Sequence, residues 1–310
     1  MGTYGQHELA ATLRNTITEE VILAMGASPK GLAGRALTPI LRLATARFAR
    51  LIAAFDLDVG NLGTRDAARN LLPHMVEGCR QSGATSIPAT GPLLVASNHP
   101  GGVDSISILA ALPRTDVKFI ISDVPFLRAL THCGGHAVYA SRDTGERMGA
   151  VRQMVRHLGQ GGTVVIFPGT ELDPDPAFLP GAGERLKDWS RSLALLLRRV
   201  PETQLVPTIV GGVLSARFYK HPVAKLAPQG WERIKLAEML QIMQQLVLGT
   251  RLNLWPTVTF GEPARVQDLV GAGATPASDA LMSTILRRAQ LLLDQYQAGQ
   301  RPASAVPIPA

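Results

Sequence analysis

The residues best suited to chemistry in this chain are a histidine and an aspartate five positions apart, His99 and Asp104. They flank a Pro-Gly-Gly turn, which is flexible enough to bring the carboxylate back onto the imidazole. A carboxylate that holds one ring nitrogen leaves the other nitrogen free to take a proton from a hydroxyl. The spacing therefore predicts a general base with its orienting partner.

Each member of this pair also has an ordinary structural interpretation. Asp104 opens an apolar stretch that is typical of a helix, so its side chain can serve as the N-cap of that helix. His99 can be a turn residue without a chemical role. Short matches of this kind arise often by chance, so the choice depends on the motifs in the rest of the chain.

The elements around the pair predict its place in the fold. Residues 93–96 form a short apolar run, as expected for a strand buried inside an α/β sheet. The segment from Asp104 onward predicts the first turns of a helix. His99 then lies at the carboxyl end of a strand, where open α/β sheets place their ligands.

From residue 92 onward, predicted strands alternate with predicted helices. This alternation is typical of a layered α/β domain with helices on the faces of a mixed sheet. The predicted strands are 93–98, 117–121, 137–139, 163–167, 205–211 and 257–260. The predicted helices lie near 104–111, 124–131, 146–158, 186–199, 233–247 and 278–297. We expect this α/β domain to span residues 86–300, followed by a Pro- and Ala-rich disordered tail over 301–310.

Residues 1–85 form an N-terminal region that we expect to be helical, with helices near 8–25, 39–55 and 65–82. The second helix carries three arginines on the side opposite its apolar face. These are Arg42, Arg47 and Arg50, and the apolar face comprises Ile40, Leu41, Phe48, Leu51, Ile52 and Phe55. A basic amphipathic helix suits an anionic membrane surface. It suits equally well a helix that packs on the main domain with a solvated arginine face.

Composition and charge limit the class of protein. Of the 310 residues, 46% are hydrophobic and 18% are charged, which is typical of a folded globular chain. The formal net charge of +7 suits an anionic membrane face or a phosphorylated substrate. The basic residues are scattered and aromatic residues make up only 5%, so we expect no nucleic-acid partner.

The two cysteines, Cys79 and Cys133, have no metal-binding spacing and predict reduced thiols in a cytosolic compartment. The first ten residues are polar, which argues against a secretory signal. No run of about eighteen uncharged apolar residues occurs, so we expect no membrane span. The expected location is the cytoplasm, with peripheral association at the inner face of the membrane. We expect no bound metal.

Three later segments of the chain also carry notable residues at the ends of predicted strands, as the segment with His99 and Asp104 does. A short strand near 137–139 leads to Arg142, which can clamp a phosphate through two parallel hydrogen bonds or form a surface ion pair. The strand 163–167 ends in the turn Pro168-Gly169-Thr170, which can cradle an anion or simply leave the sheet. The strand near 206–212 opens with a proline and closes with two glycines.

Taken in order, the four stretches resemble a known superfamily. They read His-x-x-x-x-Asp after a strand, a strand followed by Arg, Phe-Pro-Gly-Thr, and Val-Pro-x-x-x-x-Gly. This order resembles the glycerophospholipid acyltransferases, the superfamily of glycerol-3-phosphate and lysophosphatidate acyltransferases. The resemblance covers about residues 90–215.

The resemblance implies direct acyl transfer without a covalent acyl-enzyme. His99 would take the proton from an acceptor hydroxyl, and Asp104 would orient the imidazole and stabilise its charge. The hydroxyl oxygen would attack the thioester of acyl-CoA or of an acyl-carrier protein. This thioester is a co-substrate, and the resemblance implies no other cofactor.

The resemblance also implies an acceptor site. Arg142 and the turn Pro168-Gly169-Thr170 would hold the phosphate of a glycerol-phosphate or lysophospholipid acceptor, and we expect Asn98, beside His99, to contact substrate as well. Here the sequence departs from the family pattern, because Pro168 is followed directly by Gly169 and Glu171 occupies the place of a basic residue.

These departures leave alternatives open. The acceptor can lack a phosphate, or the phosphate can be held by other cations, of which the candidates are Lys118, Arg185 and Lys187. The chain can also be a non-catalytic lipid-binding or membrane-docking protein that retains the fold. A serine hydrolase is disfavoured, because no Gly-x-Ser-x-Gly motif occurs.

Overall fold

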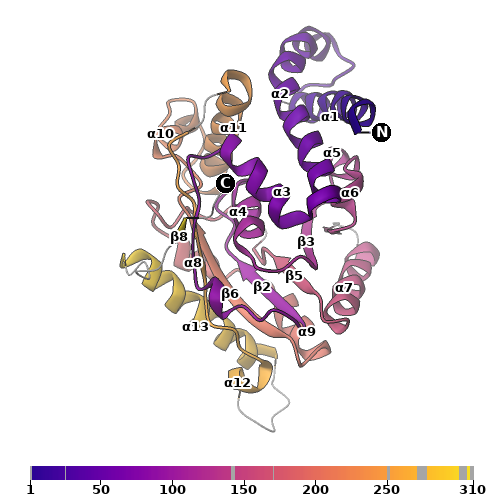
Figure 1. Ribbon diagram of the computed structural model, residues 1–310. Coiled ribbons are helices and arrows are strands. Elements are labelled where there is room, and N and C mark those ends of the chain that lie inside the picture. Colours follow the sequence, from indigo (N-terminus) through magenta and orange to yellow (C-terminus); the bar gives the residue numbers. More distant parts are fainter. Residues whose placement is uncertain are drawn as a thin grey trace.

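The computed structural model describes residues 2–24, 26–140, 144–169, 171–249, 252–270, 278–299 and 306–307 (Figure 1). A mixed sheet of eight strands runs through the described residues in the order β4-β3-β5-β2-β6-β7-β1-β8. The strands are β1 (Arg80–Ser82), β2 (Leu93–Ser97), β3 (Val117–Ser122), β4 (Ala137–Ala140), β5 (Thr163–Ile166), β6 (Gln204–Gly211), β7 (Thr257–Phe260) and β8 (Val306–Pro307). From β4 to β6 all neighbours are parallel, whereas β7 is antiparallel to β6. The predicted α/β class is thus confirmed.

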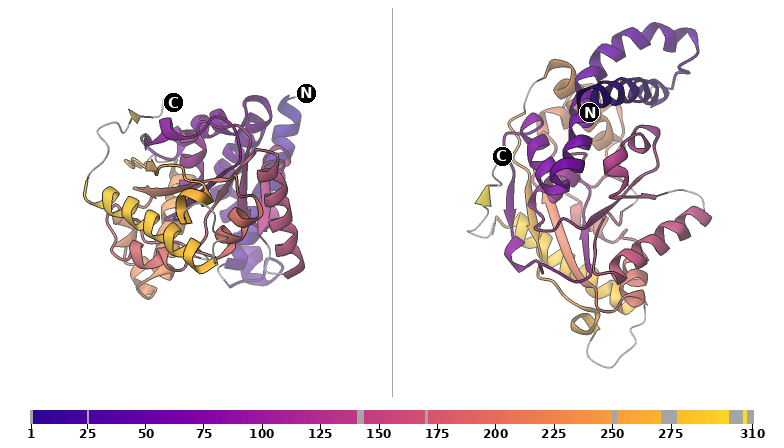
Figure 2. Two further views of the ribbon diagram at one scale, coloured as in Figure 1. Left: turned by 90° about the horizontal axis from the view of Figure 1, so that it is seen from below. Right: turned by 45° about the vertical axis from the view of Figure 1, so that its right-hand side comes forward.

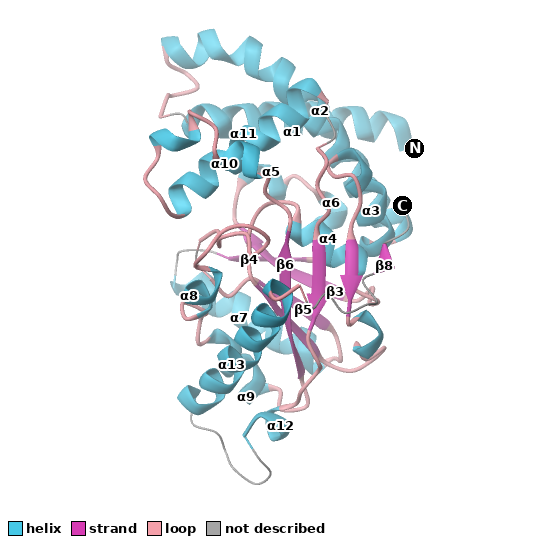
Figure 3. Cartoon of the chain, turned by 90° about the vertical axis from the view of Figure 1, so that its left-hand side faces the viewer, coloured by secondary structure: helices cyan, strands magenta, loops and turns pink. Residues whose placement is uncertain are grey.

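Helices cover both faces of this sheet and one of its ends. They are α1 (Gly2–Ala24), α2 (Leu32–Leu62), α3 (Thr64–Leu71), α4 (Asp104–Ala111), α5 (Pro125–Arg128), α6 (Thr131–Gly134), α7 (Thr144–Gly159), α8 (Ala182–Leu186), α9 (Ser192–Arg199), α10 (Ala216–Tyr219), α11 (Trp231–Leu248), α12 (Val266–Val270) and α13 (Ser278–Gln297). Short 3₁₀ turns lie at Leu72–His74, Ala84–Ser86 and Ala224–Leu226. In Figure 3, α1, α2, α10 and α11 lie at one end of the molecule, and α9, α12 and α13 lie at the other.

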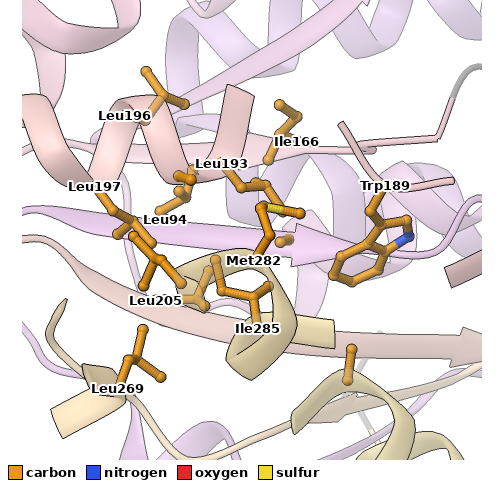
Figure 4. Packing of buried hydrophobic residues seen from close by; sticks show 14 of the residues in the cluster. Leu94, Ile166, Trp189, Leu193, Leu196, Leu197, Leu205, Leu269, Met282 and Ile285 are labelled. Atoms are coloured by element: carbon orange, nitrogen blue, oxygen red, sulfur yellow. The ribbon is translucent and has the colours of Figure 1, made fainter. Parts of the chain in front are cut away.

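The central strand β2 explains why its sequence is a continuous apolar run. All five of its residues are buried, and successive side chains point to opposite faces of the sheet. Leu93 and Val95 enter the cluster formed with α3 and α4. Leu94 and Ala96 enter the cluster on the other face, where Figure 4 shows leucines of α9 and residues of α13 around Leu94. Each fully buried aliphatic side chain stabilises the fold by about 1.5–3 kcal/mol.

Helices α1 and α2 pack side by side beyond the edge of the sheet (Figure 2). Their shared apolar cluster includes Leu13 and Ala53 and extends to Leu130 beside α6. The buried carboxylate of Asp56 on α2 accepts hydrogen bonds from the backbone N–H groups of His132 and Cys133, both within 3.0 Å. This contact ties the N-terminal helices to the α/β domain.

Helix α2 is longer than predicted, and its first half is more exposed. It begins at Leu32, and the side chain of Ile40, which we expected on the buried face, is 67% exposed. Arg42 and Arg50 are exposed as predicted, whereas Arg47 lies against Gly249 and is half-buried. The first half of α2 is more exposed because it extends past the sheet, as Figure 2 shows.

Three other boundaries differ from the sequence prediction. The helix expected over 65–82 ends at Leu71, because Pro73 lacks the backbone N–H that would continue it. Residues 80–82 instead form β1 beside β7, so the sheet begins inside the region that we expected to be helical. Within the tail that we expected to be disordered, β8 pairs with β1, and residues 301–305 and 308–310 lie outside the described residues.

Two predicted helices are each divided into two short ones. The segment 124–131 contains α5 and the start of α6, and the segment 186–199 contains the end of α8 and all of α9. Between α8 and α9, the N–H of Ser190 donates to the carbonyl of Pro168 rather than to its own helix. None of the helices in the described part of the chain has the length and apolarity needed to cross a membrane.

Candidate active site

The structure brings His99 and Asp104 together at the carboxyl end of β2. The Nδ1 atom of His99 lies 2.8 Å from Oδ2 of Asp104. The Asp104 side chain is fully buried, whereas 34% of the His99 side chain is exposed. When Nδ1 carries a proton and donates it to the carboxylate, Nε2 is left with a lone pair for a second partner. This is the arrangement that the spacing of the two residues predicts.

The turn between the two residues is closed by the same carboxylate. Oδ2 of Asp104 accepts a second hydrogen bond from the N–H of Gly101, at 3.1 Å. The N-cap of α4 is Val103, and Asp104 is the first residue of the helix. The interpretation of Asp104 as an N-cap is therefore wrong, because its side chain holds the imidazole and the turn instead.

The loop after β5 positions His99 from two directions. The ring of Phe167 stacks on the imidazole, with ring centroids 4.5 Å apart and an interplanar angle of 22°. The carboxylate of Asp173 accepts from the His99 N–H at 2.8 Å, and the Asp173 N–H donates to the His99 carbonyl at 2.8 Å. Asp173 was not among the predicted site residues, because nothing in its local sequence marks it.

Burial and nearby carboxylates have opposite effects on the charge of His99. Burial disfavours the protonated imidazole, but Asp104 outweighs this effect by charge and by its hydrogen bond. Glu238 and Asp173 add to the same effect, and together the carboxylates raise the pKa of His99 to about 9. At pH 7 the imidazole of the free protein is therefore mostly protonated.

The side chain of Asn98 pairs with the backbone of β6. Its side chain is buried, and Nδ2 donates to the carbonyl of Val210 while Oδ1 accepts from the N–H of Val210, both at 2.8 Å. These two bonds continue the pairing of β2 with β6 beyond Ser97. The side chain of Asn98 is thus fixed by the backbone of β6, directly beside His99.

The turn after β5 is described only in part. Pro168 is buried, and its carbonyl accepts from Ser190. Gly169 is half-buried, and a side chain at this position would lie 3.8 Å from the carboxylate of Asp173. Arg142 and Thr170, the other two residues predicted to hold the acceptor, lie outside the described residues.

Glu171, the acidic residue at the position where the sequence pattern leads one to expect a basic residue, is paired with a cation. Glu171 lies 3.2 Å from Arg185. The same guanidinium lies 2.8 Å from Asp188 and 3.6 Å from Asp173. Arg185 is thus shared by three carboxylates and is a poor substitute for a phosphate-binding cation.

The other two candidate cations are also engaged. Lys187 forms an ion pair with Glu184 at 2.5 Å, and Lys118 donates to the carbonyl of Gly135 at 3.3 Å. Within the described residues, no three His, Cys, Asp or Glu side chains are grouped so that they could hold a metal ion.

An apolar cavity of about 150 Å³ lies beside the start of α4. The residues that line it come from α2, α4 and β3 and from the segment around α6. They include Phe55, Val59, Ser105, Ile106, Leu109, Phe119 and Ile121. Because Ser105 follows Asp104 directly, the cavity adjoins the element that carries the catalytic candidate.

The family model that matches this chain falls on the segment that carries the sequence motifs. Residues 79–208, from just before β1 into β6, match the family model described as Acyltransferase. This segment contains His99 and Asp104. The chain is also similar to the crystal structure of PlsC, the 1-acyl-sn-glycerophosphate (LPA) acyltransferase from Thermotoga maritima. The two are 15% identical with a TM-score of 0.45, over 94% of this chain and 97% of that chain. No curated protein matches the chain.

Proposed function

Because residues 79–208 match the family model described as Acyltransferase, we propose a specific acyl transfer for the chain. A fatty acyl group moves from an acyl thioester, of CoA or of acyl-carrier protein, to a hydroxyl of a glycerol-phosphate or lysophospholipid-type acceptor. The observation that carries the proposal is the pair His99–Asp104, 2.8 Å apart at the carboxyl end of β2.

The proposed step begins at the free nitrogen of the imidazole. Nε2 of His99 takes the proton of the acceptor hydroxyl as the oxygen attacks the thioester carbonyl carbon. The tetrahedral intermediate then collapses, the C–S bond breaks, and the leaving thiolate takes the proton from the imidazolium. Asp104 stabilises the positive charge that the ring carries between these steps. General-base assistance of this kind contributes about 10²–10⁴ in rate.

The apolar cavity beside α4 supports a fatty acyl donor. Its lining is almost entirely apolar, and it adjoins the residue that follows Asp104. Each CH₂ group of an acyl chain that enters such a cavity contributes about 0.8 kcal/mol to binding. In the proposal, the acyl chain occupies this cavity while its thioester faces His99.

A second acceptor class is favoured by the charges around His99. Asp104, Asp173 and Glu238 all lie close enough to influence the imidazole. Arg185, which lies beside Asp173, is shared among carboxylates, one of which is Glu171. These negative charges would repel a phosphate and therefore favour a hydroxyl acceptor that lacks one. We keep an unphosphorylated alcohol as the second candidate acceptor. The retained pair of His99 and Asp104 argues against a non-catalytic lipid-binding role.

The proposal includes peripheral contact with an anionic membrane surface from the cytoplasmic side. The helix α2 carries the exposed apolar side chains of Leu32, Ile40 and Leu43 in its first half, together with the exposed arginines Arg42 and Arg50. Apolar side chains among basic ones suit the interface of an anionic bilayer.

A thiol-release assay with a palmitoyl thioester tests the acceptor class. The purified chain is given glycerol-3-phosphate, a lysophosphatidate, and their unphosphorylated counterparts, glycerol and a monoacylglycerol. Release that depends on the phosphorylated acceptors supports the first candidate, and release that depends on the unphosphorylated ones supports the second. Absence of release with every acceptor, from a folded protein, contradicts both.

A further inference from the structure

A glutamate far from the matched segment touches the turn that joins His99 to Asp104. Glu238 lies on α11, and its Oε1 accepts a hydrogen bond from the N–H of Gly102. A Cβ atom added to Gly101 or to Gly102 would lie 3.0 or 3.1 Å from this oxygen. The carboxylate therefore lies directly against both glycines, and any larger residue there would have to displace it.

Two different carboxylates each accept one backbone hydrogen bond from this turn. The N–H of Gly101 donates to Asp104 at 3.1 Å, and the next N–H, that of Gly102, donates to Glu238. The chain from His99 to Asp104 contains only four intervening residues. Fixing the two glycines thus fixes the path that sets the separation of the imidazole and its partner.

Glu238 is carried by a well-anchored face of α11. Gln241, one turn further, accepts from the N–H of Ser215 at 2.8 Å and donates to the carbonyl of Val213 at 2.9 Å. Gln245, one more turn along, donates to the carbonyl of Met75 at 2.5 Å. These residues are three and seven positions after Glu238, so they lie on the same side of the helix. The helix therefore presents Glu238 to the turn from a fixed position.

We propose that Glu238 is a positioning residue for acyl transfer: it fixes the turn between His99 and Asp104 and adds a carboxylate charge near the imidazole. The inference rests on the proposed function, because it takes His99 to be the base.

The charged groups around the imidazole are Asp104 on α4, Asp173 on the loop after β5 and Glu238 on α11, with Arg185 behind Asp173. Burial raises the pKa of Glu238 to about 7, so its carboxylate is ionised over the range in which His99 loses its proton. Its charge is one of those that raise the pKa of His99 to about 9. Removal of the charge at position 238 therefore makes neutral His99 available at lower pH.

The test uses E238Q in the full chain, because glutamine keeps an oxygen for the Gly102 N–H and removes only the charge. E238A removes both, and E232Q, in the first turn of the same helix, is the matched control. The protonation of His99 is followed by NMR of labelled imidazoles, with H99Q to identify its signal. We expect E238Q to lower the His99 midpoint by about 0.5–1 pH unit, and E232Q to leave it unchanged.

Kinetics provide a second readout. The acid limb of the kcat/KM profile is expected to move with the His99 midpoint in E238Q. In E238A we also expect a lower plateau, because the turn loses its anchor. An unchanged His99 midpoint in folded E238Q overturns the inference. This titration needs no substrate, so a failure of the proposed reaction is recognised separately, as absence of acyl transfer by the wild-type chain.

Discussion

Oδ2 of Asp104 accepts hydrogen bonds from both the imidazole of His99, at 2.8 Å, and the N–H of Gly101, at 3.1 Å. One buried oxygen thus fixes the orientation of the ring and the shape of the turn that carries it. The other carboxylate oxygen, Oδ1, is buried and has no hydrogen-bond partner among the described residues. The hydrogen bonds that Asp104 makes to His99 and to Gly101 thus both end at the single atom Oδ2.

The first prediction concerns this atom. In D104N the side chain keeps its size, but its NH₂ group can face Nδ1 of His99. The imidazole then carries its proton on Nε2, where it cannot accept the hydroxyl proton. We expect kcat to fall by about 10²–10⁴. Steady-state thiol release measures the loss, and D66N, at an exposed position on α3, serves as the control. Near-wild-type kcat in D104N contradicts the assigned role of Asp104.

The second prediction is a pH dependence. Only neutral His99 can take a proton, and its pKa is raised to about 9. At pH 7 about one-hundredth of the free enzyme carries the neutral ring, and this fraction rises tenfold per pH unit until it levels off near the pKa. We expect kcat/KM to rise with slope one between pH 6.5 and about 8.5. A profile that is flat or falls over this range is incompatible with His99 as the base in the free enzyme.

The third prediction separates a positioning role of Asn98 from substrate binding. N98A leaves the backbone N–H and carbonyl of Val210 without their partners in a buried place. The free energy of unfolding is expected to fall by about 2–4 kcal/mol, as measured by urea unfolding. N70A, which removes an exposed asparagine, is the control. Unchanged stability together with a raised acceptor KM would restore Asn98 as a substrate contact.

The sequence was informative wherever local pattern decided the structure. The apolar runs ending at Ser97, Ile166 and Gly211 became β2, β5 and β6, because strands buried on both faces need apolar residues throughout. The pairing of His99 with Asp104 was predictable for a similar reason, since only a flexible turn separates them. The family resemblance joined these segments in one domain.

The features that the sequence did not reveal depend on contacts between distant segments. Glu238 lies on α11, well beyond the matched segment, and only the packing of that helix brings its carboxylate to Gly102. Asp173 is a further case, because a loop must fold back to reach the backbone of His99. The strands β1 and β8, of three and two residues, are too short to show a periodic pattern.

The fourth prediction concerns the membrane. In R42E/R50E two exposed positive charges on α2 become negative, so binding to vesicles with an anionic phospholipid is expected to fall about tenfold or more at low salt. Arg47 is left unchanged because it lies against Gly249. The control is R198E/R199E on α9, which carries the same charge change at the opposite end of the molecule (Figure 3). Equal sedimentation of both double variants with vesicles would argue against docking through α2.

The most direct test of the account compares the wild-type chain with H99A in acyl transfer from a palmitoyl thioester, using whichever acceptor supports turnover. Because H99A leaves the buried Asp104 carboxylate without its imidazole partner, a loss of stability is expected, and thermal unfolding verifies that the variant is folded at the assay temperature. We predict that acceptor-dependent thiol release falls by at least about 10² while binding of the thioester is retained. Turnover by folded H99A within a few-fold of wild type would contradict the central claim that His99 is the general base.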